Sequence, residues 1–432
     1  MKIKIENSSY KYISDNSNEC DEDTAFLVSK QNEKFLNDAK SKGAYILTPQ
    51  VLQYQLGIDS VKIIGITGTN GKTTTAAAIY SFMLDLGFKT ALQGTRGFFI
   101  NEERVKEKGL TTPPLLETID NIYKAKEQGC QYFVMEVSSH ALDQGRVESL
   151  KFALKVFTNL TQDHLDYHKS FDEYKRVKSQ FFADESLKLI NKDSTKIEFN
   201  PKNCYTYALD APASFNITAF TLNEGISAIV RYLGEQSDFY SPMHGLFNVY
   251  NLLAAISSVK LLTDKKIDEI CEVVENFAGV SGRMEVVGTS PLIIVDFAHT
   301  PDGMQQVLDS MKDKELVVVF GAGGNRDKSK RVMMGRVANR FAKKIYLTSD
   351  NPRDEEPMDI IMDIYEGIED KQKVKVASLR EDAIRLAIQE LNDGEVLMVL
   401  GKGDEEFQEI KGEKIAFDDR VVIREILNKK EG

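Results

Sequence analysis

Cysteine and long hydrophobic runs are scarce in this sequence, and each absence excludes a class of protein. The four cysteines, Cys20, Cys130, Cys204 and Cys271, are far apart and form no C-x-x-C pair. Neither a disulfide framework nor a zinc site of the usual spacing is therefore expected, and the pattern is typical of a reducing compartment. No stretch reaches the roughly 18 apolar residues of a spanning helix, and the N-terminus has no apolar signal core. We expect a cytoplasmic protein that does not enter a membrane.

Positive charge is also in short supply. The net charge is −11 over 432 residues, of which 42% are hydrophobic and 28% charged. General binders of nucleic acid or of anionic membranes present a basic face, so we expect neither as a partner. The composition is otherwise that of a globular protein, and the length predicts two or three domains. We expect a monomer.

The chain divides into three blocks, which we predict to be domains over residues 1–58, 59–281 and 282–432. The first block is short and polar and has one strand–helix–strand pattern. In the other two, apolar runs alternate with stretches of helical periodicity, which predicts parallel sheets. The expected fold is α/β, with a small N-terminal α/β domain, a central parallel-sheet domain and a C-terminal Rossmann-like domain. Ligands of such sheets bind beyond the carboxyl ends of the strands.

The strongest local signal is "GTNGKTT" (68–74), which follows a buried-strand pattern and opens a helical one. Backbone N–H groups at such a turn point at phosphate, helped by the helix dipole. The usual first glycine of the motif is replaced by Ile66, but the strand–loop–helix context disfavours an ordinary glycine-rich turn. We therefore predict a P-loop ATPase domain in which Lys72 reaches the outer phosphates and the Thr73 hydroxyl binds Mg²⁺. The predicted nucleotide-binding residues are Gly68, Thr69, Asn70, Gly71, Lys72, Thr73 and Thr74.

A carboxylate and two histidines stand where magnesium ligands are needed. Glu136 ends the apolar run "YFVMEV", either as a ligand beside the phosphate loop or as a solvated strand-end residue. His164 and His168 are spaced i, i+4, which allows a shared helical face and a metal site, although such a pair is more often surface chemistry. No third soft ligand is nearby, so we favour one histidine serving Mg²⁺ over a zinc site.

The stretch "TSDNPRDEEP" (348–357) places one arginine among acids after a predicted strand. Arg353 is either a turn residue paired with Asp354 or Glu355, or a reader of a negatively charged ligand. A guanidinium fork binds a carboxylate with two parallel hydrogen bonds. The acids that follow it are expected to be solvated residues at the start of a helix.

A set of motifs in fixed order suggests a family. They are "GITGTNGKTTT", "TTP", "EVSSHALDQGR", "FTNLTQDHLDYH", "HGLFNVYN", "GRME", "DFAHTPD", "GAGGNRDKSKR" and "SDNPR". Together they make residues 60–420 resemble the Mur ligases, and within them the MurE type. The resemblance implies amide bond formation in peptidoglycan precursor synthesis. ATP would phosphorylate the glutamate carboxylate of UDP-N-acetylmuramoyl-L-Ala-D-Glu, and the amine of meso-diaminopimelate would attack the acyl phosphate. The alternative is the same chemistry with L-lysine.

The resemblance also implies the metal and nucleotide sites. Two Mg²⁺ ions would be held by Thr73, Glu136, His164 and a carbamate, derived from CO₂, on Lys178 in "YKRVKSQFF". The other interpretation of Lys178 is an ordinary surface lysine on a cation-rich helix. Catalytic roles would fall to Lys72, Lys178, Glu136 and His164. The base and ribose of ATP would contact Asn248, Asn251, Arg283 and Asp296, with His244 and Phe247 beside the adenine.

The implied substrate residues fall into two groups. The nucleotide-sugar substrate would contact Ser17, Thr111, Thr112, Ser138, Gln144 and Arg146. The amino acid would contact Arg326, Asp350, Asn351, Pro352, Arg353, Gly401 and Glu405, and Arg353 would take the distal carboxylate that diaminopimelate has and lysine lacks. Two departures from the family are Asp404, where His is common, and a shortened first block in which Asn18 replaces an arginine. A trimmed uridine-binding domain is the resulting hypothesis.

Rival functions come from two sources. Folylpolyglutamate synthase and the Mur ligase that adds a dipeptide share the superfamily, but "EVSSH" and "DNPR" favour the MurE type. A P-loop ATPase or nucleotide switch without amide chemistry is disfavoured by the third block, whose predicted strands end in ligand-like residues.

Overall fold

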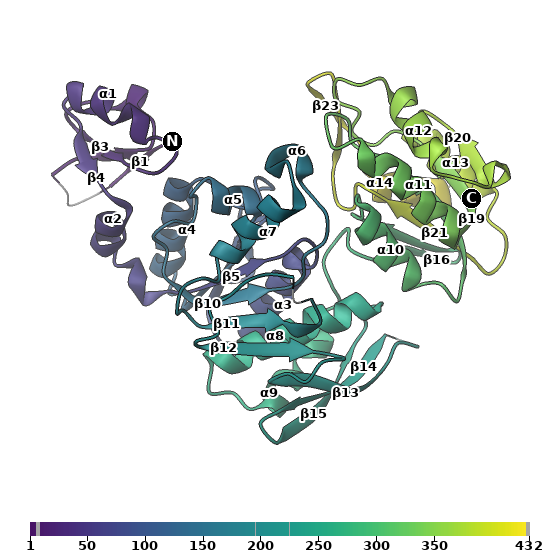
Figure 1. Cartoon of the computed structure of the whole chain (residues 1–432), viewed down its shortest axis with the longest axis horizontal. Helices are drawn as coiled ribbons and strands as arrows, with labels where there is room; N and C mark the ends of the chain where they lie inside the picture. The colour runs from purple at the N-terminus through teal and green to yellow at the C-terminus, as the bar shows by residue number, and fades with distance from the viewer. Residues whose placement is uncertain (6–8, 195, 224, 429–432) are drawn as a thin grey trace.

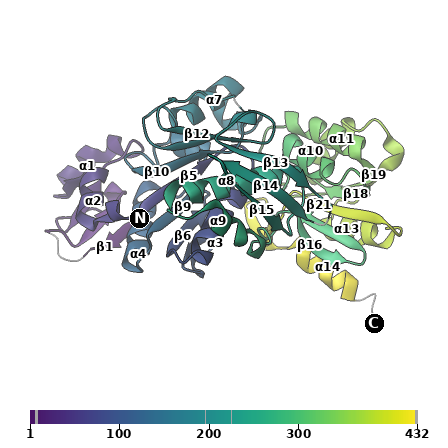
Figure 2. The ribbon, with the colours of Figure 1, turned by 90° about the horizontal axis from the view of Figure 1, so that it is seen from below.

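The computed structural model describes residues 1–5, 9–194, 196–223 and 225–428, and it has three lobes (Figure 1). Each lobe is built on its own β-sheet. The lobes follow one another along the long axis of the molecule, with the N-terminal lobe at one end and the C-terminal lobe at the other (Figure 2). The prediction of an α/β fold with three domains is confirmed.

The N-terminal lobe contains a four-stranded sheet in the order β1-β2-β3-β4. The predicted strand–helix–strand pattern corresponds to β3, the short helices η2 and α1, and β4. Thr48 caps the following helix α2, which leads into the central lobe. The elements are β1 (Lys2–Lys4), β2 (Tyr12–Ser14), η1 (Ser17–Glu19), β3 (Thr24–Leu27), η2 (Glu33–Phe35), α1 (Leu36–Ser41), β4 (Tyr45–Leu47), α2 (Pro49–Leu56) and η3 (Ile58–Ser60).

The central lobe contains an eleven-stranded sheet in the order β15-β14-β13-β12-β11-β10-β5-β9-β6-β7-β8. Its middle is parallel as predicted, but β13 to β15 and β6 to β8 pair antiparallel. Short turns connect these end strands, and a short turn can join only antiparallel neighbours. The strands are β5 (Lys62–Thr67), β6 (Thr90–Gly94), β7 (Gly97–Ile100), β8 (Glu103–Lys106), β9 (Tyr132–Glu136), β10 (Phe152–Phe157), β11 (Lys188–Asn191), β12 (Cys204–Ala208), β13 (Phe215–Thr221), β14 (Ile226–Tyr232) and β15 (Glu235–Ser241).

Buried helices cover this sheet. The paired helices α3 and α8 are alanine-rich and apolar on nearly all sides, as expected of helices enclosed in a core. The start of α8 lies beside the start of α3, because a Cβ at Gly71, the residue before α3, would lie 2.4 Å from Oδ1 of Asn251 in α8. The helices are α3 (Lys72–Asp85), α4 (Leu115–Glu127), α5 (Ser139–Asp143), α6 (Leu165–His168), α7 (Phe171–Gln180), η4 (Lys192–Ser194), α8 (Leu246–Leu262), α9 (Ile267–Glu272) and η5 (Val274–Asn276).

The C-terminal lobe contains a six-stranded sheet in the order β16-β17-β21-β18-β19-β20, parallel except for β16. Its strands are nearly continuous apolar runs, as expected for a sheet covered on both faces. The elements are β16 (Glu285–Thr289), β17 (Leu292–Asp296), α10 (Pro301–Asp309), β18 (Glu315–Phe320), α11 (Ser329–Phe341), β19 (Ala342–Leu347), α12 (Pro357–Glu366), η6 (Lys371–Lys373), β20 (Val374–Val376), α13 (Arg380–Gln389), β21 (Glu395–Leu400), β22 (Phe407–Ile410), β23 (Glu413–Ala416) and α14 (Asp419–Asn428).

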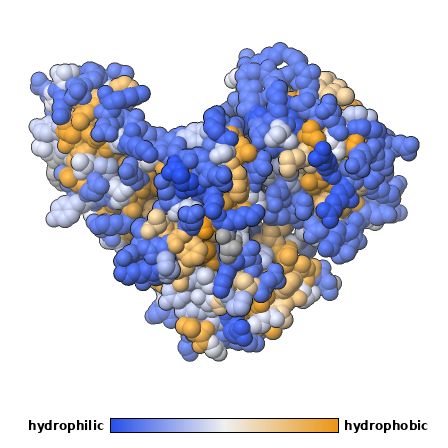
Figure 3. Space-filling model, viewed as in Figure 1, coloured by the Kyte–Doolittle hydropathy of each residue, from blue (hydrophilic) through white to orange (hydrophobic). Residues whose placement is uncertain are grey.

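The surface between the N- and C-terminal lobes is hollowed, and its walls are mainly hydrophilic (Figure 3). The carboxyl ends of β17, β18, β19 and β21 are followed by the loops that carry the predicted ligand-binding residues. Among the described residues, no helix is both long and apolar enough to cross a bilayer.

Candidate active site

The phosphate loop lies between β5 and α3, as the sequence predicts. Two of its positions have no room for a larger residue than glycine. A Cβ at Gly68 would lie 1.9 Å from Thr158 Oγ1, and one at Gly71 would lie 2.4 Å from Asn251 Oδ1. Gly71 also has φ +82°, a left-handed conformation that favours glycine. The loop is therefore packed tightly against the end of β10 and against α8.

Some backbone N–H groups of the loop donate to other residues of the protein, and others remain available to a ligand. Thr69 N–H donates to the Asn159 carbonyl, and Asn70 N–H donates to Asn159 Oδ1, each over 2.9 Å. These two groups thus bind the protein itself, which differs from the expectation that they point at phosphate. The N–H groups in the first turn of α3 have no intrahelical partner and remain for an anion, favoured there by the helix dipole.

Two lysines, the half-buried Lys72 and the buried Lys178, converge on this loop. Lys72 Nζ donates to the carbonyl oxygens of Gly68 and Thr69 over 2.9 and 2.8 Å. Lys178 Nζ, from α7, donates to the Gly68 carbonyl over 2.8 Å and to Thr67 Oγ1 over 3.3 Å. Burial lowers the pKa of both amines, and the nearby Lys72 charge contributes to holding the Lys178 pKa well below its usual value. Lys178 is 1% exposed, so its interpretation as a surface lysine is wrong.

The predicted magnesium ligands lie beside the phosphate loop. Glu136, at the end of β9, accepts from Thr73 Oγ1 over 2.8 Å and from Thr95 N–H over 2.9 Å. It is buried, so its interpretation as a solvated strand-end residue is wrong. Thr73, Glu136 and His164 line one cavity of about 340 Å³. A carboxylate and a hydroxyl are ligands that Mg²⁺ accepts, with phosphate oxygens and water completing its shell.

The two histidines of the i, i+4 pair lie in different surroundings. His164 precedes α6 with φ +53° and lines the cavity, whereas His168 ends α6 and is buried. Burial lowers the pKa of His164 to about 3, so its imidazole is neutral and able to act as a ligand. Among the described residues, no cluster of three His, Cys, Asp or Glu side chains is placed to hold a metal alone.

The residues predicted for the base and ribose of ATP lie around the same cavity. On α8, Asn251 Nδ2 donates to Asn248 Oδ1 over 2.9 Å. Asp296, which ends β17, accepts from the N–H groups of Met284 and Ala298, each over 2.7 Å. Arg283 covers the Phe297 ring with its Cζ 4.3 Å from the ring centroid. Asn251, Arg283, Asp296 and Phe247 line the 340 Å³ cavity, while Asn248 and His244 line a neighbouring one.

The residues predicted for the nucleotide-sugar substrate form one hydrogen-bonded group. Arg146 donates to the Thr112 carbonyl over 2.7 Å and to Gln144 Oε1 over 2.7 and 3.0 Å. Thr112 Oγ1 donates to the Glu136 carbonyl and accepts from Ser138 N–H. Thr111 contacts Thr95 and lines the nucleotide cavity. Ser17 is outside this group, because it is buried in η1 of the N-terminal lobe, where its carbonyl accepts from Lys42.

The N-terminal lobe nevertheless touches this group. Lys30 Nζ donates to the Asp143 carbonyl over 3.1 Å, and Gln31 Nε2 donates to Gln144 Oε1 over 3.0 Å. Gln144 is therefore in contact with the N-terminal lobe as well as with Arg146.

The residues predicted for the amino acid surround a second cavity, of about 170 Å³. The packing of Gly401 is tight, since a Cβ there would lie 2.4 Å from Asp350 Oδ2. Lys402, which the sequence analysis did not single out, is fully buried and donates to Glu405 and Asn351 over 2.9 and 3.3 Å. Its place in the sequence between the predicted residues Gly401 and Glu405 is a signal that could have found it. The predicted residues that line the cavity are Arg326, Asp350, Asn351, Arg353, Gly401 and Glu405, whereas Pro352 packs its carbonyl against Gly324.

Arg353 has a different partner from those expected. Its Nε donates to Glu409 over 2.9 Å and its Nη1 to the Gly324 carbonyl over 2.8 Å. Glu355 instead binds the buried Arg331, which lowers the Glu355 pKa to about 2. Of the two interpretations of Arg353, the one that pairs it with Asp354 or Glu355 is wrong, and so is the expected solvation of Glu355. Glu409, in β22, thus holds the Arg353 side chain, which lines the cavity.

Asp404 joins two lobes. Its carboxylate lies 3.0 Å from Lys108 Nζ and 3.9 Å from Arg96 Nε, both in the β6–β8 region of the central lobe. An aspartate suits this position because both of its neighbours are cations.

The two cavities, of about 340 and 170 Å³, meet. Asp163, His164, Phe297, His299 and Arg326 line both of them. A phosphate loop that faces a second ligand cavity suits an enzyme that transfers a phosphoryl group and then joins a second molecule in the same place.

Family models identify this class of enzyme. Residues 66–259 match the model described as Mur ligase middle domain, and residues 282–403 match the Mur ligase glutamate ligase domain. The chain belongs to the Mur ligase family.

Relatives of similar length refine the comparison. A protein of Wolinella succinogenes is 50% identical over 433 residues, and one of Helicobacter pylori is 48% identical over 448, each alignment covering 100% of both chains. Both are named UDP-N-acetylmuramoyl-L-alanyl-D-glutamate--2,6-diaminopimelate ligase. A solved structure with that name is 28% identical, with a TM-score of 0.69 over 100% of this chain and 98% of its own. A Mycobacterium tuberculosis folylpolyglutamate synthase, 17% identical with a TM-score of 0.66 over 82% of this chain and 91% of its own, shares the fold.

Proposed function

We propose that this protein is an ATP-dependent ligase that joins meso-diaminopimelate to the D-glutamate carboxylate of UDP-N-acetylmuramoyl-L-Ala-D-Glu in peptidoglycan precursor synthesis. The observation that carries this proposal is the junction of the two cavities at His164 and Arg326. A carboxylate activated in the first cavity lies beside an amine held in the second. The relatives that match over the whole chain carry the corresponding name.

The reaction has two steps. The glutamate carboxylate attacks the γ-phosphorus of ATP, ADP leaves, and an acyl phosphate forms. The amine of diaminopimelate then attacks the carbonyl carbon, phosphate leaves, and the amine gives up a proton. Lys72 would neutralise charge on the transferred phosphoryl group, and the first turn of α3 would hold the phosphates that precede it.

The proposed metal and carbamate sites rest on the kinds of ligand atoms that the nearby side chains offer. Thr73, Glu136 and His164 would hold Mg²⁺ together with phosphate oxygens, and the ions would neutralise charge that the protein's own cations do not reach. Lys178 does not line the cavity, but its amine is buried 2.8 Å from the Gly68 carbonyl. A lowered pKa keeps the amine neutral, and the neutral amine is the form that adds CO₂. A carbamate there would supply the carboxylate for the second ion.

The domain boundaries at residues 58 and 281 belong to the same proposal, as does a shortened uridine-binding domain. The alignment with the W. succinogenes relative covers 100% of both chains, so that relative shares the short first block. A structure with the UDP-linked substrate would test this, and uridine held mainly outside residues 1–58 would contradict it.

An amino-acid panel tests the function. Purified protein, ATP and UDP-N-acetylmuramoyl-L-Ala-D-Glu are incubated with meso-diaminopimelate, L-lysine or no amino acid, and products are identified by mass. We expect phosphate release that requires both substrates and a product with added diaminopimelate. Preferential addition of L-lysine would support the alternative substrate, and phosphate release without either substrate would reject the ligase assignment.

Arg353→Ala is expected to raise the KM for diaminopimelate far more than the KM for ATP. The variant removes the cation that would bind the distal carboxylate, and loss of such a desolvated partner costs about 2–5 kcal/mol. Steady-state kinetics with each substrate varied in turn measures the effect.

Arg385→Ala is the matched control, because Arg385 lies in the same lobe on α13 and pairs only with Glu381 across the helix surface, among the described residues. Its kinetics should equal those of the unmodified protein. If Arg353→Ala changes both KM values equally, Arg353 has no role in reading the distal carboxylate.

A further inference from the structure

We propose that Asp302 is a positioning residue that docks the C-terminal lobe on the phosphate loop, and that the attack by the amino acid depends on this contact. Asp302 is the second residue of α10. Its Oδ2 accepts from Asn70 Nδ2 over 2.7 Å and from Thr161 Oγ1 over 3.1 Å, both in the central lobe. The third donor to the same oxygen is Gln306 Nε2, one helical turn along α10, over 2.9 Å.

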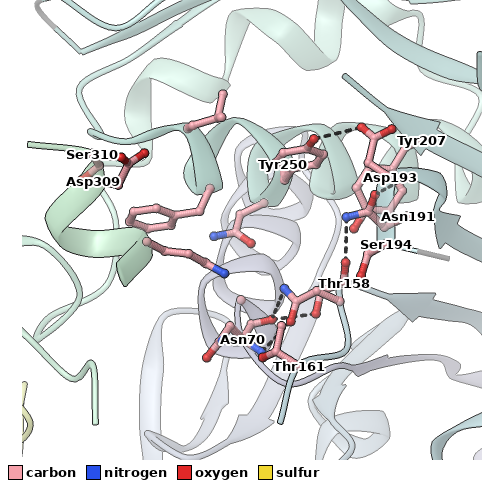
Figure 4. A pocket seen from close by; sticks show the side chains of 16 residues that line it. Asn70, Thr158, Thr161, Asn191, Asp193, Ser194, Tyr207, Tyr250, Asp309 and Ser310 are labelled. Atoms are coloured by element: carbon pink, nitrogen blue, oxygen red, sulfur yellow. Dashed lines mark hydrogen bonds between the residues drawn. The ribbon is translucent and has the colours of Figure 1, made fainter. Parts of the chain in front are cut away.

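The central-lobe side of this contact is rigid. The Asn70 carbonyl accepts from Thr158 Oγ1 over 2.6 Å and from Asn159 Nδ2 over 3.1 Å, and its N–H donates to Asn159. Figure 4 shows Asn70, Thr158 and Thr161 gathered at one end of a cavity behind the phosphate loop. Because Asn70 is held at its backbone on both sides, its side chain offers Asp302 a fixed donor. The phosphate loop therefore fixes the position at which Asp302, and with it α10, docks on the central lobe.

The chemistry of the group favours docking over nucleotide binding. An ionised carboxylate only accepts hydrogen bonds, and bonds to it are stronger than neutral ones. It would repel phosphate rather than bind it. No cation pairs with Asp302 within the described part of the chain, so its partners are neutral donors whose geometry decides the contact.

Other contacts join the same two lobes but reach different places. Lys330 Nζ lies 2.5 Å from Asp163 Oδ1, next to His164, and Lys108 pairs with Asp404 near the β6–β8 hairpins. Asp302 reaches the phosphate loop itself. It is thus placed to keep the nucleotide cavity and the amino-acid cavity joined while the acyl phosphate is attacked.

The inference rests on the proposed function, and it separates the two half-reactions. The UDP-linked substrate is assigned to residues of the N-terminal and central lobes, whereas the amino acid is assigned to the C-terminal lobe. Loss of docking should therefore affect the amino-acid step and leave the KM for the UDP-linked substrate unchanged.

The test compares Asp302→Ala, Asp302→Asn and Asn70→Ala with the unmodified full chain. For Asp302→Ala we expect kcat/KM for diaminopimelate to fall about 10- to 100-fold, in line with the loss of two hydrogen bonds to a charged group. Asp302→Asn keeps an acceptor oxygen and should recover most of that loss. Acyl phosphate formation, trapped as a hydroxamate with hydroxylamine at saturating ATP, should persist in Asp302→Ala and Asp302→Asn.

Two controls make the result decisive. Gln306→Ala removes the donor that lies within α10 and should change kcat/KM by less than about threefold, because this i, i+4 hydrogen bond stays within one helix and does not join the two lobes. In a double-mutant cycle, Asn70→Ala combined with Asp302→Ala should be no slower than Asp302→Ala alone, because both remove one contact.

Additive losses in the cycle, or equal losses of hydroxamate and amide product, would overturn the proposal. Should Asp302→Ala fail to fold, Asn70→Ala tests the same contact from the central lobe. Failure of the proposed function is distinguishable, because the unmodified protein would then form no diaminopimelate product at all.

Discussion

Lys72→Ala is expected to abolish product formation, with kcat reduced by at least about 10³-fold. Lys72 is half-buried at the phosphate loop, and its Nζ lies 2.9 Å from the Gly68 carbonyl, where outer phosphates would approach. Without Lys72, no cation from α3 would neutralise the charge that develops on the transferred phosphoryl group. Phosphate release in the presence of both substrates measures the loss, and calorimetry with ATP separates binding from chemistry.

Lys72→Arg keeps a charge at this position but replaces a compact ammonium by a planar fork. We expect it to recover little activity, since the ammonium fits among two carbonyl groups at hydrogen-bond distance. Full activity in Lys72→Ala would show that the loop does not bind the phosphoryl group that is transferred.

Lys178→Ala is expected to reduce kcat by about 10²–10³-fold, the range seen when one electrostatic stabiliser is removed from an active site. The proposed carbamate would be lost with the amine, and with it the carboxylate for the second ion. Short carboxylates such as acetate should restore part of the activity, because they can occupy the volume of the missing side chain. Kinetics with and without added carboxylate measures both effects.

The pH and CO₂ dependence of the unmodified protein follows from the same chemistry. Carbamate formation consumes a neutral amine and CO₂ and releases a proton, so it is favoured at higher pH. The lowered Lys178 pKa keeps the amine neutral to lower pH than an ordinary lysine. Activity of enzyme freed of CO₂ should therefore rise on addition of bicarbonate, more at pH 8 than at pH 6.

Lys175→Ala is the matched control on the same helix. Its side chain is 34% exposed and pairs with Glu198 over 3.4 Å, so its removal should leave kcat unchanged. Equal losses in the Lys175 and Lys178 variants would point to damage to α7 rather than to a carbamate.

Local patterns predicted much of the site. The strand–loop–helix arrangement of residues 62–85 follows from a buried apolar run, glycines and helical periodicity, all of which act over a few residues. The placement of Glu136 at a strand end follows in the same way. The antiparallel ends of the central sheet were missed, because strand direction depends on which distant strand is a neighbour.

The partners of charged groups were the least predictable feature. Sequence neighbours suggested that Arg353 would bind Asp354 or Glu355, but it binds Glu409, and Glu355 binds Arg331. Glu409 reaches Arg353 from β22, which lies far from Arg353 along the chain. Side-chain pairing over 56 positions in the chain leaves no local periodicity or spacing to detect.

The sequence by itself determined the α/β class, the phosphate loop and the ordered motifs that indicate the family, because these depend on short-range patterns and on residue identity. Only the tertiary structure decided that Lys178 is buried, that the two cavities share His164 and Arg326, and that Asp302 reaches Asn70 across 232 positions. Burial and distance are properties of packed surfaces, and packing is set by contacts between segments that the order of residues does not place together.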